Sequence, residues 1–254
     1  MAGEKLPQVV FLGTNGWYDT AATGNAVCAL VRTRRWDIVL DAGNGLYKLD
    51  RYVEGKKPVF LLLSHFHIDH IAGLHVLAKF RLAAGLTICG GKGARRHLGR
   101  FVNRPFSVPL DKLPYPVKVL ELPADRASLP FRAESLPLVH ADPVLGYRLE
   151  LDGKVLSYIT DTGPCPNALA LARGADLLIT ECANLPGEFN PGWPHFNPET
   201  AGRLAAEAGA GRLVMTHFSA ARYTSWSARL KARSVARREF PRAEAARDGL
   251  RIAL

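Results

Sequence analysis

Six consecutive residues, His65-Phe66-His67-Ile68-Asp69-His70, contain four side chains that bind divalent metal ions. They follow the apolar run Val59-Phe60-Leu61-Leu62-Leu63-Ser64, which has the length of a strand buried on both faces. A strand that ends where the ligands begin would hold these side chains rigidly. Imidazole suits zinc and its neighbours, and the Asp69 carboxylate adds a hard anionic ligand. One metal ion does not need so many ligands, so this stretch predicts part of a larger metal site.

Length and composition predict one large globular domain over residues 1–254. Of the 254 residues, 48% are hydrophobic and 22% are charged, which is enough for a substantial core. No apolar run approaches the ~20 residues of a membrane helix, and Met1 to Leu12 lacks the basic-then-apolar layout of a signal peptide. We therefore expect a cytoplasmic protein without membrane contact. The four cysteines are widely spread and are expected to be free thiols.

The net charge of +10 has two interpretations. Its densest cluster is Arg229, Arg233 and Arg237, which recur every four residues after Trp226, so a helix there would carry a basic face. Such a face is either simply solvated or in contact with a phosphate backbone such as that of RNA. The sequence leaves both interpretations open.

Strand and helix patterns fall into two blocks along the chain, each mostly strands followed by helix and strand. Predicted strands lie at residues 8–12, 26–33, 36–40, 59–64 and 87–89, with helices at 46–53, 71–82 and 94–101. Further along the chain, predicted strands lie at 117–122, 131–139, 144–151, 154–159, 176–180 and 213–216, with a helix after Asn197 and a closing strand at 250–254. Two such blocks indicate an α/β sandwich, with two sheets face to face and helices outside, rather than a doubly wound sheet.

Three further candidate ligands end predicted strands that come after the His65 to His70 stretch. His140 follows residues 135–139, Asp161 follows residues 157–160, and His217 follows residues 213–216. Each one alone could be a buried or turn-capping residue. Together with the His65 to His70 stretch, however, they predict a common metal site.

At this point the chain resembles the metallo-β-lactamase superfamily, and specifically its ribonuclease Z-like branch. The matching residues are Phe11-Leu12-Gly13-Thr14, the His65 to His70 stretch, His140, Gly146-Tyr147-Arg148, Asp161-Thr162, Glu181, His195, Thr216-His217-Phe218-Ser219 and Arg222-Tyr223. The resemblance covers nearly the whole chain and implies the four-layer αββα sandwich, in agreement with the strand pattern.

The resemblance also implies a dinuclear hydrolytic centre. One zinc ion would be held by His65, His67 and His140, the other by Asp69, His70 and His217, and Asp161 would bridge the two, with manganese as an alternative metal. Two such ions lower the pKa of a shared water from about 15.7 toward ~7, which suits attack on phosphorus by a bridging hydroxide. Asp69 would also orient or deprotonate that water. His195, oriented by Glu181, would protonate the leaving alkoxide.

The short gap between His140 and Asp161 bears on the substrate. Processing ribonuclease Z proteins carry a long tRNA-gripping arm between these two motifs, whereas here only 20 residues separate them. The opening loop Tyr18 to Asn25 and the spacing from His217 to Arg222 also depart from that branch. We therefore expect a phosphodiesterase that acts on small or cyclic phosphodiesters or on short nucleic acid ends.

Several alternatives stay open at this stage. The chain could be an armless tRNA 3′-processing endonuclease that uses its basic C-terminal helix, or a related hydrolase of sulfate esters or lactones. A nucleic-acid-binding or scaffold protein that has lost catalysis is a third class, against which the intact ligand set argues. A homodimer is one option for the assembly.

Overall fold

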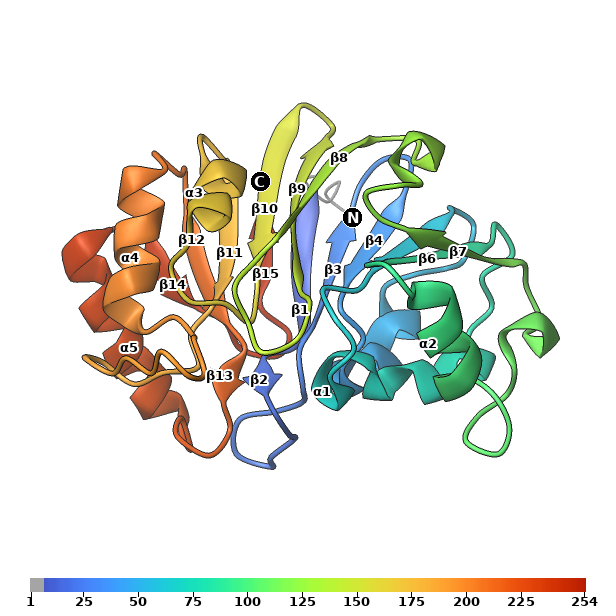
Figure 1. Cartoon of the computed structure of the whole chain (residues 1–254), viewed down its shortest axis with the longest axis horizontal. Coiled ribbons are helices and arrows are strands. Elements are labelled where there is room, and N and C mark those ends of the chain that lie inside the picture. The colour runs from blue at the N-terminus through green and yellow to red at the C-terminus, as the bar shows by residue number, and fades with distance from the viewer. Residues whose placement is uncertain (1–6) are drawn as a thin grey trace.

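Two β-sheets packed face to face form the centre of the computed structural model, which describes residues 7–254 (Figure 1). The first has strand order β15-β1-β3-β4-β5-β6-β7 and contains β1 (Gln8–Gly13), β3 (Cys28–Arg32), β4 (Asp37–Leu40), β5 (Val59–Leu62), β6 (Leu86–Gly90), β7 (Val117–Glu121) and β15 (Arg251–Ala253). The second has order β14-β12-β11-β10-β9-β8 and contains β8 (Arg132–Pro137), β9 (Leu145–Leu151), β10 (Lys154–Ile159), β11 (Leu177–Glu181), β12 (Leu213–Thr216) and β14 (Ala243–Ala245).

Helices cover the outer face of each sheet, as Figure 1 shows. The first sheet is covered by α1 (Ile68–Ile71), α2 (Ala94–Phe101) and the 3₁₀ segments η1 (Asn44–Arg51) and η2 (Ala72–Lys79). The second is covered by α3 (Pro166–Ala172), α4 (Pro198–Glu207) and α5 (Trp226–Glu239). Short 3₁₀ turns η3 (Leu110–Lys112) and η4 (Arg126–Ser128) lie in connections. The predicted αββα sandwich is confirmed.

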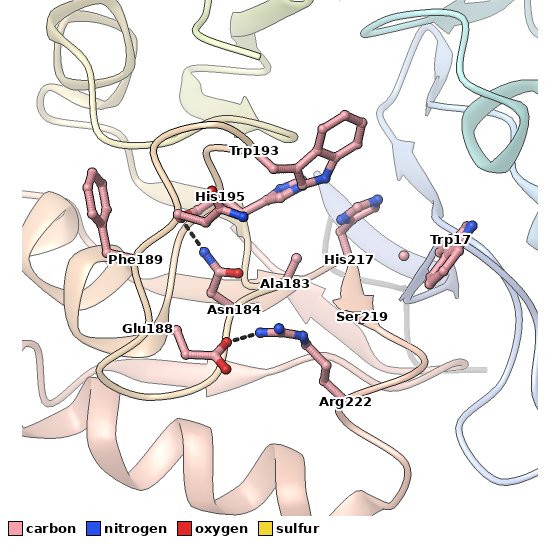
Figure 2. Close-up of a pocket in the computed structure, with 12 residues that line it drawn as sticks. Trp17, Ala183, Asn184, Glu188, Phe189, Trp193, His195, His217, Ser219 and Arg222 are labelled. Atoms are coloured by element: carbon pink, nitrogen blue, oxygen red, sulfur yellow. Dashed lines mark hydrogen bonds and ion pairs between the residues drawn. The ribbon is translucent and has the colours of Figure 1, made fainter. Parts of the chain in front are cut away.

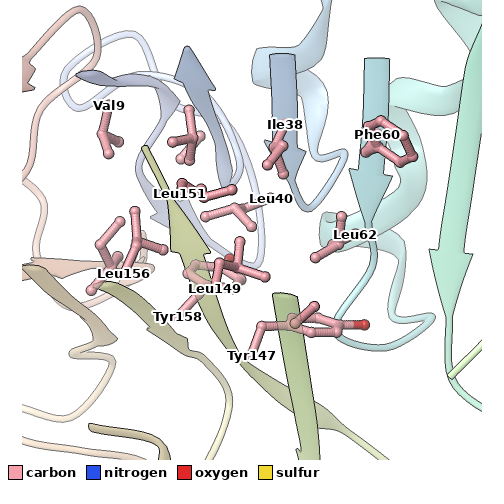
Figure 3. Close-up of a cluster of buried hydrophobic side chains, with 14 of the residues drawn as sticks. Val9, Ile38, Leu40, Phe60, Leu62, Tyr147, Leu149, Leu151, Leu156 and Tyr158 are labelled. Atoms are coloured by element: carbon pink, nitrogen blue, oxygen red, sulfur yellow. The ribbon is translucent and has the colours of Figure 1, made fainter. Parts of the chain in front are cut away.

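Strand β5 explains why the apolar run of the sequence is continuous. Phe60 and Leu62 belong to the core between the two sheets, whereas Val59 and Leu61 belong to the core between the first sheet and its helices. Because successive side chains point to opposite faces, a strand buried on both faces must be apolar at every position. Figure 3 shows part of the inter-sheet core, which includes Phe60, Leu62 and Tyr147 of β9.

Several predicted boundaries agree closely with the structure. The hairpin between β9 and β10 turns at Asp152 and Gly153, whose φ angles of 49° and 78° suit a two-residue turn. Asn197 caps α4, because its side chain accepts a hydrogen bond from the Thr200 amide. The closing strand is β15, which pairs with β1.

The helix predicted at residues 71–82 was placed incorrectly. It begins at Ile68 as the single turn of α1 and continues as the 3₁₀ segment η2. The segment predicted as a helix at 46–53 is likewise the 3₁₀ segment η1. The two stretches pack so closely that their backbones are in contact. A Cβ on Gly73 would lie 2.3 Å from the Gly43 carbonyl oxygen. A consequence for the site is that Asp69 and His70 are helical residues.

The basic face predicted on the C-terminal helix is only partly exposed. Arg229 of α5 is buried, and its guanidinium donates hydrogen bonds to Thr14 and Asn15. Arg233 pairs with Glu244 at 2.9 Å, and the exposed Arg237 donates to the Ala243 carbonyl of β14 at 2.8 Å. Arg229 was therefore wrongly assigned to this face, and for the exposed residues of the face both interpretations stay predictions. Among residues 7–254, no helix is long and apolar enough to cross a membrane.

Candidate metal centre

The first group of candidate ligands combines loops from both sheets. His65 and His67 follow β5, whereas His140 and Asp161 lie three residues beyond β8 and two beyond β10. One ligand atom from each of these four residues lies within 4.8 Å of the others. His140 and Asp161 are therefore loop residues, not the last residues of strands as the sequence suggested.

The second group consists of Asp69, His70 and His217, from α1 and the end of β12. The Nε2 atoms of His70 and His217 lie 3.1 Å apart, and they lie 3.7 Å and 3.3 Å from Asp69 Oδ2. Ligand atoms around a tetrahedral zinc ion are separated by roughly 3.3 Å, given Zn–N distances of about 2.0–2.1 Å. These three atoms therefore have the spacing of three corners of such a tetrahedron.

Asp161 lies between the two groups. Its Oδ1 is 3.3 Å from Nε2 of both His70 and His217, which is the spacing of a fourth corner. Its Oδ2 lies on the other side, 3.9 Å from His65 Nε2. One carboxylate thus presents one oxygen to each group.

The local electrostatics suit cations at both positions. Burial lowers the pKa of His65 to about 2 and also lowers that of His140, so both imidazoles are neutral. His65 Nε2 and both His140 nitrogens are buried without a hydrogen-bond partner. Burial alone would lower the pKa of His70, but the carboxylates of Asp161, Asp41 and Asp69 raise it instead. Unpartnered neutral nitrogens beside buried carboxylates are the donor set that divalent zinc or manganese would satisfy.

A second pair, Glu181 and His195, lies beside these groups. His195 Nδ1 is 2.5 Å from Glu181 Oε1, and the carboxylate also accepts hydrogen bonds from the Thr162 and Ala183 amides. Burial would lower the pKa of His195, but the Glu181 carboxylate outweighs it and raises that pKa to about 9. This raised pKa favours the protonated form of His195 at neutral pH. His75 and His97 lie outside both candidate metal groups.

Comparison with known proteins decides the family. The family model of the beta-lactamase superfamily domain matches residues 35–218. This chain belongs to the metallo-β-lactamase superfamily. The probable metallo-hydrolase YhfI of Bacillus subtilis is 31% identical over 74% of this chain and 78% of its own length. The crystal structure of that protein superposes with a TM-score of 0.77, at 25% identity, and covers 96% of this chain and 98% of YhfI.

Ribonuclease Z of Synechococcus sp. (strain CC9605) is a further relative within the superfamily. It is 28% identical over 84% of this chain and 86% of its own length. The superfamily members related to this chain are metal-dependent hydrolases, and the two candidate metal groups described above fit that chemistry.

Asp41 lies next to the candidate metal centre and holds the His70 ring. The sequence patterns did not identify it as a site residue. Its buried Oδ2 lies 2.9 Å from His70 Nδ1 and accepts a hydrogen bond from the Tyr158 hydroxyl at 2.7 Å. Its Oδ1 accepts from the Ser64 amide and hydroxyl. Asp41-Ala42-Gly43 has the sequence pattern of a turn. The one sequence signal for a site residue was that Asp41 directly follows a predicted strand, as other candidate site residues do.

We expect Asp41→Asn to weaken zinc binding by about 10- to 100-fold at the group Asp69, His70 and His217, because the carboxylate would no longer fix the His70 ring. Competition with a chelator of known zinc affinity measures this loss. Asp37→Asn is the matched control, since Asp37 is also buried near the start of β4 but pairs with Lys57. Equal zinc affinity in the Asp41 variant and the wild type would contradict a supporting role.

Proposed function

We propose that this protein is a dinuclear metal-dependent phosphodiesterase that acts on small or cyclic phosphodiesters or on short nucleic acid ends. The observation that carries the proposal is the position of Asp161, which turns one oxygen to each of two ligand groups. Two metal ions held a few Å apart activate water and clamp the attacked phosphoryl group. Within the proposal, one ion would be held by His65, His67 and His140, the other by Asp69, His70 and His217, and Asp161 would contribute to both.

Asp69 has a second task in this proposal. Its Oδ2 accepts a hydrogen bond of 2.7 Å from the Trp17 amide, which fixes the carboxylate in one orientation. Burial would raise its pKa, but His70 and His217 outweigh burial and lower it, so Asp69 is ionised. An ionised carboxylate held in this way can orient the attacking water through a hydrogen bond. Its lowered pKa makes it a weak base, so orientation is the better supported of the two tasks expected of Asp69.

His195 supplies the proton for the leaving group. Its imidazolium is held by Glu181 and lines the same cavity of about 630 Å³ as Asp69, Asp161 and His217. A leaving alkoxide needs a proton as its bond to phosphorus breaks, and a positioned imidazolium can donate one. Glu181 acts through His195 by holding its Nδ1.

The connection between His140 and Asp161 supports a small substrate. Most of it is the hairpin of β9 and β10, which pairs along its length within the second sheet. The remaining residues connect this hairpin to the site. This connection therefore has no projecting segment that could grip a folded RNA.

A second candidate, tRNA 3′-processing, is favoured by the similarity to ribonuclease Z over most of both chains. A comparison of substrates separates the two. We expect the zinc-loaded protein to hydrolyse bis(4-nitrophenyl) phosphate and cyclic nucleotides with higher kcat/KM than aryl sulfates, lactones or precursor tRNA. Asp161→Asn, prepared in parallel, controls for contaminating hydrolases. Precursor tRNA cleaved far better than every small ester would overturn our first choice in favour of the second.

We expect His195→Ala to keep two metal ions per chain but to slow hydrolysis by about 10²- to 10⁴-fold for alkyl leaving groups, and much less for 4-nitrophenolate, which leaves without a proton. Kinetics over a series of leaving groups, together with metal analysis, measures both effects. His75→Ala is the control, because His75 is exposed and its Nδ1 lies 2.6 Å from the Ala72 carbonyl oxygen. Loss of metal from the His195 variant would show that the acid role is wrong.

A further inference from the structure

Two exposed tryptophans face the cavity above the metal centre. Trp17 and Trp193 line the cavity of about 630 Å³ that contains Asp69 and Asp161, and also the neighbouring cavity of about 540 Å³ that contains Arg222 (Figure 2). Their side chains are 70% and 48% exposed. The chain has four tryptophans, so half of them are at this opening. Large aromatic rings left in water beside a catalytic cavity indicate a surface that a ligand covers.

Trp17 has a backbone conformation that a bulky residue rarely adopts. Its φ of 77° is in the left-handed region, which is unfavourable for a bulky residue and persists only where the surroundings enforce it. The amide of Trp17 donates to Asp69 Oδ2, so the loop is fixed to a residue of the site. The indole nevertheless points outward. The conformation therefore sets the position of the ring at the cavity rather than burying it.

Trp193 is positioned by the imidazoles of the site. Its ring is parallel to that of His67, with 2° between the planes and 6.3 Å between centroids. The centroids of His140 and His195 lie 5.2 Å and 6.2 Å from it. The indole thus stands at the edge of the metal centre beside the proposed proton donor, where the ester groups of a bound phosphodiester would lie.

The charges of the cavity wall favour a ligand with one phosphate. Among the lining residues that the structure describes, Arg222 is the one arginine or lysine in the neighbouring cavity, and it forms an ion pair with Glu188. Asn184 and Ser219 beside it are neutral. The metal centre can receive one phosphoryl group, but this wall has no uncompensated arginine or lysine for a second.

We propose that Trp17 and Trp193 form an aromatic clamp for the planar ring of a phosphodiester with a single phosphate, as in a nucleoside ester. This inference rests on the proposed function and names its substrate class. Base–aromatic stacking strengthens binding by roughly 5- to 150-fold per base. The clamp would select esters by their ring rather than by a chain of phosphates.

The test uses three trifluoroethyl phosphodiesters whose other ester group is thymidine (through its 5′ oxygen), benzyl or methyl. In all three, trifluoroethoxide is the better leaving group and has no ring, and ¹⁹F NMR records the trifluoroethanol released when the zinc-loaded protein hydrolyses each ester. Wild type should hydrolyse the thymidine and benzyl esters with at least tenfold higher kcat/KM than the methyl ester. A thymidine ester preferred over benzyl identifies a nucleoside as the ligand, whereas a benzyl ester preferred over thymidine would overturn that assignment.

Two variants remove the rings one at a time. Trp193→Ala and Trp17→Gly should each lower the ratio of thymidine to methyl ester at least fivefold; glycine tolerates the positive φ and keeps the amide that Asp69 needs. Phe106→Ala is the matched control, because Phe106 is 74% exposed and lines neither cavity. Equal slowing of both esters, or an altered oligomeric state in size-exclusion chromatography, would overturn the clamp.

Failure of the proposed function can be told apart from failure of the clamp. If wild type hydrolyses the methyl ester without preferring the ring esters, the clamp is wrong and the proposed function stands. If no phosphodiester is hydrolysed, the proposed function is wrong, and calorimetric binding of thymidine 5′-monophosphate against methyl phosphate decides on the clamp. Weaker nucleotide binding in both tryptophan variants would support the clamp, and unchanged binding would overturn it.

Discussion

The buried carboxylate of Asp41 is the constraint on which the rest of the site depends. It follows β4 of the first sheet and accepts hydrogen bonds from Ser64 after β5 and from Tyr158 of β10 in the second sheet. A fully buried charge is costly unless it is hydrogen-bonded, and here several donors satisfy both oxygens. Because those donors belong to both sheets, the contact that satisfies the charge also fixes the sheets relative to each other and orients His70 between them.

Strained backbone at the site follows from the same arrangement. Asp41, Asp161 and His217 all have φ near 50°, in the left-handed region, and each lies just beyond a strand. Such conformations persist only where the surroundings enforce them, and here two packed sheets do so. The backbone at Gly16 packs directly against His217, since a Cβ at position 16 would lie 2.6 Å from the His217 ring. The core thus holds the ligands at the short distances that metal binding requires.

Local sequence patterns predicted the sandwich and the His65 to His70 stretch, because strand periodicity and ligand spacing are short-range properties. They missed what depends on distant contacts. Asp41 looked like a turn residue, since its partners are up to 117 positions away. Arg229 looked like part of a basic surface, because helical spacing does not reveal that Thr14 and Asn15 are packed beneath it. Trp17 and Trp193 are 176 positions apart, and no local pattern predicts that both line one cavity, because this is a property of the fold alone.

We propose that Asp161 bridges two metal sites within one centre. Crystals of the zinc-loaded protein, measured on both sides of the zinc absorption edge, test this proposal. We expect two anomalous peaks about 3.5–4 Å apart, one beside His65, His67 and His140, the other beside Asp69, His70 and His217, with Asp161 between them. A single peak, or two peaks that do not share Asp161, would contradict the proposal.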